Sequence, residues 1–256
     1  MTFKTVKIAV TTAAIMALTG FGAVANPPVE IPAPEPKLKN FDVTGTTPEN
    51  CRRIAAEAEA QRASLAKLWL GKELTDWAKP CPLRVTLSAT GAGGATTFAF
   101  EAGSAAPADV AIMGSLERIL GNQLPHEVAH AVLAAHFRQP VPRWADEGVA
   151  ILSESKGEQK RHDQILLQLL NAGRALRLSH LFELKQYPSD MITLYTQGYS
   201  VARFLVERKD RATFLSFVNA GMKDGWDAAA TRCYEFDTVS ELEKSWIEWF
   251  HKAGKK

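Results

Sequence analysis

The chain has 256 residues, of which 46% are hydrophobic and 23% charged, and its formal net charge is +2. These values exclude a disordered, a collagen-like or a highly charged chain, and the length allows one domain with a substantial core. The small net charge also argues against nucleic acid as the main partner, because phosphate binding needs a clear basic excess.

Residues 1–25 have the layout of a secretory signal peptide. Lys4 and Lys7 precede the apolar segment 8–25, which ends in Ala-Val-Ala before Asn26. This order is typical of an exported protein; the alternative is an N-terminal membrane anchor. Removing the segment would leave 28 of the 30 basic residues against 28 acidic ones, which is a neutral mature chain.

No later stretch approaches the roughly 20 apolar residues that a helix needs to span a bilayer. We therefore expect a periplasmic or secreted protein, monomeric, with no stable membrane span once the signal peptide is removed.

The segment 26–40 contains five of the thirteen prolines and is predicted to be an extended spacer before a single folded domain at 41–256. The first helix of that domain is predicted to begin after Thr47 as N-cap and to run to about Leu70. Gly71 supplies its stop signal.

Three short strands are predicted next, at 84–88, 96–101 and 109–113, from alternating side chains bounded by turn residues. From Ser115 onward the pattern is helical almost to the end, and a capping box at 240–243 predicts the start of the last helix. The fold class is therefore α+β, with a small N-terminal sheet followed by a helical C-terminal part.

Export permits disulfides, and the chain has three cysteines. Cys51 and Cys81 flank the first helix and its following loop, so we predict a bridge between them, which leaves Cys233 over. Three buried thiols are the alternative.

His126, Glu127 and His130 form an H-E-x-x-H motif in a predicted helix. Residues four apart lie on one helix face, so the two imidazoles converge at the spacing of two Zn²⁺ ligands, with Glu127 beside them as a base. The segment 139–142 ends this helix, and Glu147 lies in the next one, seventeen positions after His130. A His₂Glu set leaves one zinc position for water, which is the catalytic arrangement.

These residues resemble the gluzincin metallopeptidases, the peptidase MA-like group. The segment 144–150 (WADEGVA) is similar to W-x-N-E-G-F-A of the aminopeptidase N family, in which the Glu is the third zinc ligand. The segment 195–198 (YTQG) is similar to that family's Y-x-x-G, whose Tyr stabilises the tetrahedral intermediate. The resemblance covers about 115–208 and implies a zincin-like fold built around an active-site helix.

The resemblance implies a zinc peptidase that acts on peptides or proteins, and the predicted signal peptide implies that it is exported. Zn²⁺ would be held by His126, His130 and Glu147, with Glu127 as general base and Tyr195 as oxyanion stabiliser. We do not expect an aminopeptidase, because the segment 93–97 replaces the family's G-x-M-E-N motif and offers no carboxylate for a free amine. A peptide could add as an extra strand beside 96–101.

Several alternatives stay open. A silent zincin could bind peptide or cell-envelope material, and a helical scaffold could carry the motif by accident. Tyr195 could be a packing residue, with Tyr199 or His180 in its place. Asp146 could accept from a ligand imidazole or simply sit at a helix N-terminus. Glu154 could pair with Arg161. The remaining histidines are expected to be structural: His136, His162 and His251.

Overall fold

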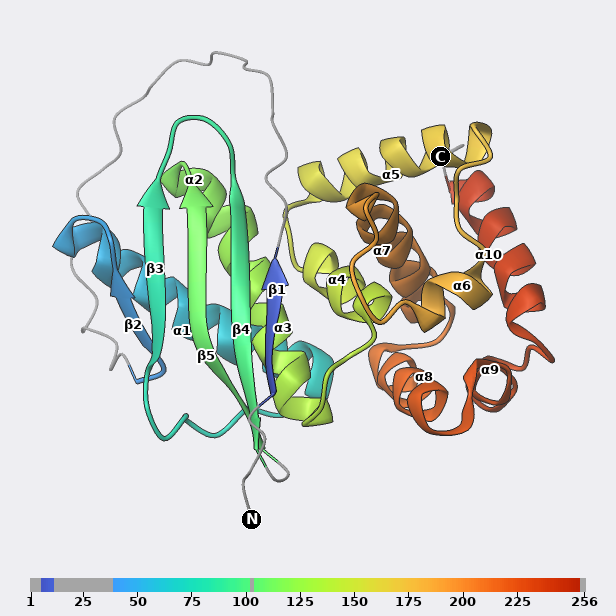
Figure 1. Ribbon diagram of the computed structural model, residues 1–256, viewed down its shortest axis with the longest axis horizontal. Helices are drawn as coiled ribbons and strands as arrows, with labels where there is room; N and C mark the ends of the chain where they lie inside the picture. Colours follow the sequence, from blue (N-terminus) through green and yellow to red (C-terminus); the bar gives the residue numbers. More distant parts are fainter. Residues whose placement is uncertain (1–5, 12–38, 102–103, 254–256) are drawn as a thin grey trace.

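The computed structural model describes residues 6–11, 39–101 and 104–253, and it is α+β, with a small sheet followed by helices (Figure 1). The described elements in chain order are β1 (Val6–Thr11), β2 (Phe41–Thr44), α1 (Pro48–Leu70), β3 (Cys81–Leu87), β4 (Gly93–Glu101), β5 (Ser104–Gly114), α2 (Leu116–Arg118), the π-helical turn η1 (Ile119–Gln123), α3 (Leu124–Phe137), α4 (Arg143–Leu152), α5 (Lys156–Asn171), α6 (Leu178–Glu183), α7 (Met191–Arg208), α8 (Arg211–Asp224), α9 (Trp226–Tyr234) and α10 (Val239–Ala253).

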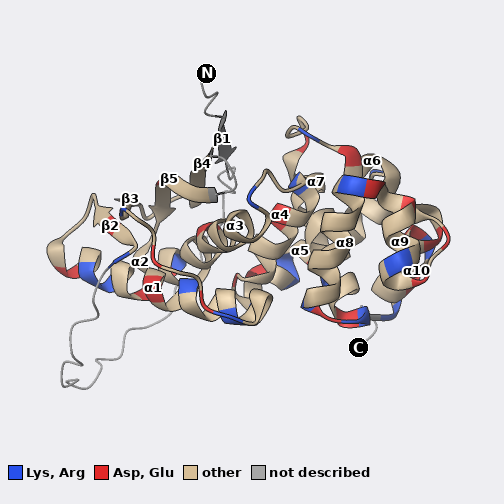
Figure 2. Ribbon diagram, turned by 90° about the horizontal axis from the view of Figure 1, so that it is seen from below, with Lys and Arg blue, Asp and Glu red and all other residues tan. Residues whose placement is uncertain are grey.

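The sheet has five strands in the order β1-β4-β5-β3-β2. β2, β3 and β5 are parallel to one another, whereas β4 is antiparallel to both of its neighbours. Helices α1 and α3 pack on one face, and no described helix covers the other (Figures 1 and 2). β3 alternates accordingly, with Leu83 and Val85 buried against the helices and Arg84 exposed.

The first predicted helix is confirmed at both ends. The hydroxyl of Thr47 accepts a hydrogen bond from the amide of Asn50, and Pro48 occupies the first turn, where its missing N–H is harmless. Gly71 adopts the left-handed conformation with φ of 70° and closes the helix. The three predicted strands are confirmed in type and are longer than predicted, as β3, β4 and β5.

The last helix begins earlier than predicted, at Val239. The hydroxyl of Thr238 accepts from the amide of Glu241, while the Glu241 carboxylate accepts from the amide of Asp237. The capping interaction therefore starts at Thr238 rather than at Ser240.

The predicted bridge between Cys51 and Cys81 is not formed, and all three cysteines are free thiols. Cys51 lies in the first turn of α1, beyond the end of β2, whereas Cys81 pairs with Phe41 at the start of β2. The amide of Cys81 donates to Asn40, whose own amide donates to Glu59, eight positions after Cys51 on α1. The two thiols therefore lie toward opposite ends of this strand pair, separated by about 12 Å of helix at 1.5 Å per residue.

The segment 1–25, predicted to be a signal peptide, is described only at 6–11, which form β1, and the rest of it lies outside the described residues. The predicted spacer 26–40 lies outside them as well, except for Lys39 and Asn40. Asn40 is buried, and its side-chain amide donates to Glu59 and Asp76. Within the described ranges, no helix combines the length and apolar character needed to cross a membrane.

Helices α4 and α7 approach each other closely at two glycines. A Cβ built on Gly198 of α7 would lie 2.5 Å from the carbonyl oxygen of Trp144 in α4. A Cβ on Gly148 of α4 would lie 2.5 Å from the carbonyl oxygen of Gly198. Neither position has room for a methyl group, so these two glycines allow the backbones of α4 and α7 to touch.

We expect Gly198→Ala to lower the free energy of unfolding by about 1–3 kcal/mol, because the added methyl group must push α4 and α7 apart. Urea unfolding measures this change. Gly157→Ala is the matched control: its Cβ would meet only Ser155 Oγ, at 3.7 Å, in helix α5. Alanine there should be neutral or slightly stabilising, and an equal loss in both variants would contradict the close-packing argument.

Candidate metal centre

The H-E-x-x-H motif lies on α3, which continues a helical segment that begins at Leu116. A π-helical turn, Ile119–Gln123, precedes α3, and Pro125 stands in its first turn. The wider π turn suits a proline that cannot donate an N–H, so the helical segment continues from η1 into α3 with Pro125 in the first turn of α3.

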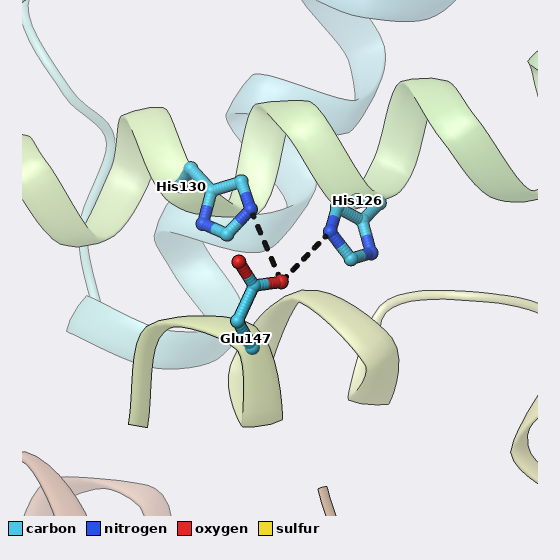
Figure 3. A group of neighbouring side chains, drawn as sticks. All are labelled: His126, His130 and Glu147. Atoms are coloured by element: carbon cyan, nitrogen blue, oxygen red, sulfur yellow. Dashed lines mark ion pairs between the residues drawn. The ribbon is translucent and has the colours of Figure 1, made fainter. Parts of the chain in front are cut away.

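Glu147 reaches the same point from α4. Residues Pro140 and Pro142 separate α3 from α4, which begins at Arg143. Trp144 anchors α4 in the helical core, where its ring packs 4.5 Å from that of Phe182. The carboxylate of Glu147 then faces α3 (Figure 3).

The three predicted ligands meet at one point. Glu147 Oε2 lies 3.3 Å from Nε2 of His126 and 3.9 Å from Nε2 of His130, and the three ligand atoms lie within 4.8 Å of one another (Figure 3). A tetrahedral zinc ion with bonds of about 2.1 Å separates its ligand atoms by about 3.4 Å. The observed spacing is therefore close to that of a metal site.

The same three atoms, His126 Nε2, His130 Nε2 and Glu147 Oε2, are buried and have no hydrogen-bond partner among the described residues. Buried polar atoms are rarely left without a partner, because burying them unpaired costs free energy. Two imidazole nitrogens and one carboxylate oxygen are also a donor set that zinc prefers. The residues present therefore fit a zinc ion.

A carboxylate contacts the Nδ1 atom of each imidazole, away from the Nε2 ligand atom. His126 Nδ1 lies 2.6 Å from Glu154 Oε1, and His130 Nδ1 lies 2.8 Å from Asp146 Oδ1. A carboxylate on Nδ1 fixes the ring and leaves the Nε2 lone pair for a metal. The prediction of a pair between Glu154 and Arg161 is wrong, because Glu154 turns toward His126 and Arg161 pairs with Glu158.

The carboxylates also set the protonation of the site. Burial lowers the pKa of His126, but Glu147 and Glu154 outweigh burial, and the net pKa is raised. Burial raises the pKa of Glu147, but the two histidines outweigh it and the net pKa is lowered. Glu147 is therefore the anionic member of the ligand set.

Tyr187 forms a hydrogen bond with Glu147 that orients its carboxylate. The sequence pattern did not identify this residue. Its hydroxyl donates to Glu147 Oε1 over 2.6 Å, and Arg143 Nη1 donates to the same hydroxyl over 3.3 Å. Tyr187 lies in the segment between α6 and α7, forty residues from Glu147. No periodicity or motif spacing marks a residue in such a segment.

Glu127 points to the sheet instead of into the ligand set. Its Oε2 accepts a 2.6 Å hydrogen bond from the hydroxyl of Thr96 on β4, and a Cβ on Gly94 would overlap its Oε1. Gly94 therefore lets β4 pass directly over the carboxylate. Burial raises the pKa of Glu127, although His126 and His130 oppose the shift.

Tyr195 lies on α7 in the wall of a cavity that also borders His126. Burial raises the pKa of Tyr195, and the charges of Glu147 and Glu127 add to the shift, so its hydroxyl stays protonated and can donate. The rival Tyr199 accepts a 2.7 Å hydrogen bond from Arg203. The other rival, His180, is exposed on α6.

Of the histidines expected to be structural, His162 lies nearest to the site. It is buried on α5, its Nδ1 lies 3.1 Å from the hydroxyl of Thr196, and burial lowers its pKa to about 4. His162 is therefore neutral at neutral pH, and it lines the same cavity as Tyr195.

No protein-family model, curated protein or solved structure matches this chain.

We expect the protein to hold about one zinc per chain when it is purified without chelator. His126→Ala and His130→Ala should lose the metal, because each removes one of three ligands. Elemental analysis measures the zinc content. Chelation should also lower the melting temperature of the wild type, since a ligand present at 1,000 times its Kd stabilises by about 4 kcal/mol.

The matched control is His180→Ala, which removes an exposed histidine and should keep the zinc. Wild-type protein free of zinc, or His130→Ala protein with full zinc, would contradict the metal site.

Proposed function

We propose that the protein is an exported zinc-dependent peptidase of the gluzincin type that hydrolyses peptide bonds. The observation that carries this proposal is the convergence of three buried ligand atoms, which have no hydrogen-bond partner among the described residues, beside a second buried glutamate, Glu127. The resemblance of the residues around Glu147 and Tyr195 to the aminopeptidase N family points to the same chemistry.

His126, His130 and Glu147 would hold the ion. When bound, zinc supplies a Lewis acid and lowers the pKa of water to about 7. Asp146 and Glu154 keep the two imidazoles in the orientation that this requires, and Tyr187 does the same for Glu147.

Glu127 is the proposed general base. It follows His126 directly on α3, so its carboxylate lies beside the ligand set without joining it. It would take the proton of the attacking water and pass it to the leaving amine. The hydrogen bond from Thr96 to Oε2 fixes the orientation of this carboxylate.

Tyr195 is the proposed oxyanion stabiliser. Its phenol lies close enough to Glu147 and Glu127 for both charges to raise its pKa, and it borders the cavity beside His126. A protonated phenol there can donate to the oxygen on which charge develops. Tyr187, whose ring centre is 6.2 Å from that of Tyr195, is the alternative donor.

The side of β4 that pairs with β1 is the proposed peptide-binding edge, which removal of residues 1–25 as a signal peptide would expose. β1 already pairs with it in antiparallel register, on the side of the sheet that faces helices α4 to α7 (Figure 1). Thr96 and Gly94 place β4 against Glu127. A peptide in the position of β1 would therefore run past the proposed base and form backbone hydrogen bonds with β4.

Glu127→Gln should retain zinc and lose peptide hydrolysis by 10²–10⁴-fold or more, because the amide cannot accept the proton of water. A proteome-derived peptide mixture, analysed by mass spectrometry before and after incubation, measures cleavage. Glu117→Gln, an exposed position in the same helical segment, is the control and should cleave as the wild type does.

Unchanged turnover in Glu127→Gln would show that Glu127 is not the general base. Zinc in the wild type without cleavage of any peptide would favour the alternative function, a silent zincin that binds peptide or cell-envelope material.

Tyr195→Phe should lower kcat about 100-fold with little change in zinc content, since one oxyanion donor contributes about 3 kcal/mol. Steady-state kinetics on a peptide from the cleavage profile measures this effect. Tyr187→Phe is the comparison, because it removes the hydrogen bond to Glu147 and should weaken zinc binding first. Full activity in Tyr195→Phe would give the donor role to Tyr187.

A further inference from the structure

A cavity of about 110 Å³ opens beside the candidate metal centre. His126 and Tyr195 form one part of its wall, and Ile151 is a buried apolar part. An engineered cavity of about 150 Å³ admits one benzene molecule. The cavity is therefore of a size for one side chain or for the end of a chain.

The register of β1 shows how a peptide on β4 would approach this cavity. Val6 lies opposite Phe100 and Thr11 opposite Ala95, so β1 runs toward the start of β4. The start of β4, at Gly93, lines the cavity. We expect a substrate peptide to bind β4 in the same direction as β1. The residues that follow the bond at the metal centre then lie at the cavity.

The charged side of the cavity holds two arginines and one carboxylate between them. Arg118 Nη2 lies 3.7 Å from Glu158 Oε1, and Arg161 Nη1 lies 3.3 Å from Glu158 Oε2. Both distances are long for charge-assisted hydrogen bonds, which are typically about 2.7–2.9 Å. Among the described residues neither guanidinium has another side-chain carboxylate partner, so both retain donors that can turn into the cavity.

The second carboxylate at the cavity is paired with neither arginine. Glu154 is directed at His126, whose Nδ1 lies 2.6 Å from it. His162, also in the wall, is neutral. The group Arg118–Glu158–Arg161 therefore carries a local excess of one positive charge beside an apolar wall.

We propose that this cavity binds a carboxylate of the substrate, on the carboxyl side of the cleaved bond, through Arg118 and Arg161. The carboxylate belongs either to an Asp or Glu side chain that follows the cleaved bond or to the free C-terminus of the peptide. This inference rests on the proposed function, because it takes the bond at the metal centre as the one that is cleaved.

The first test is the residue preference of cleavage. If an acidic side chain is bound, the wild type should cleave before Asp and Glu about tenfold or more faster than before Asn and Gln. If the chain end is bound, it should release the last residue about tenfold or more faster than it cleaves internal bonds. Arg118→Gln and Arg161→Gln should each reduce this preference to about threefold or less. Arg53→Gln, an exposed arginine on α1, is the matched control and should keep it.

The two sources of the carboxylate are separated by amidating the C-termini of the peptide mixture. Amidation should abolish the preference if the cavity binds the chain end, and should leave it unchanged if it binds an acidic side chain. Melting temperature and zinc content of each variant show that the site remains folded. Equal cleavage before neutral and acidic residues, or a preference for Lys and Arg, would overturn the proposal.

A binding measurement tests the cavity apart from catalysis. Two pairs of alanine-based hexapeptides are titrated into the Glu127→Gln protein by calorimetry. The members of one pair carry a single Glu or a single Gln, and the members of the other pair end in a free or an amidated C-terminus. Tighter binding of a carboxylate peptide, lost when Arg161→Gln is added, supports the proposed cavity. Absence of cleavage by the wild type would overturn only the peptidase function and not this cavity assignment. Equal affinity across the pairs would overturn the cavity assignment.

Discussion

Two imidazole nitrogens and one carboxylate oxygen are buried at one point between α3 and α4, and none of them has a hydrogen-bond partner among the described residues. Such an arrangement is unfavourable unless other groups hold it in place. Glu154 and Asp146 fix the imidazoles, and Tyr187 fixes the carboxylate of Glu147. Each inner ligand atom thus has an outer polar contact on the same side chain, which orients it and leaves the inner atom for a cation.

The position of α4 follows from this requirement. Trp144 packs among the aromatic side chains of the helical core, and Gly148 and Gly198 allow α4 to touch α7. The close contact brings Tyr195 of α7 toward the carboxylate of Glu147. On the other side, Gly94 lets β4 lie over Glu127. The sheet and the helical part therefore meet at the candidate centre, and β4 lies along it.

Much of the local structure was predictable, because its causes lie within one or two turns of chain. Thr47 and Gly71 define α1 through a side-chain cap and a left-handed residue. His126 and His130 share a helix face because they are four residues apart. The predicted bridge between Cys51 and Cys81 was wrong because the first turn of α1 and the start of β3 lie toward opposite ends of the β2–β3 pair, which the order of the elements along the chain does not show.

The sequence by itself determined the helix that carries the motif, the donor types, and the return of Glu147 after a short proline-containing connection. Only the tertiary structure decided which residues support those ligands. Glu154 meets His126 across 28 positions, and Tyr187 meets Glu147 across 40. Such contacts depend on how α3, α4 and the segment before α7 pack together, and packing is set by the summed burial of many side chains rather than by a local spacing that can be read along the chain.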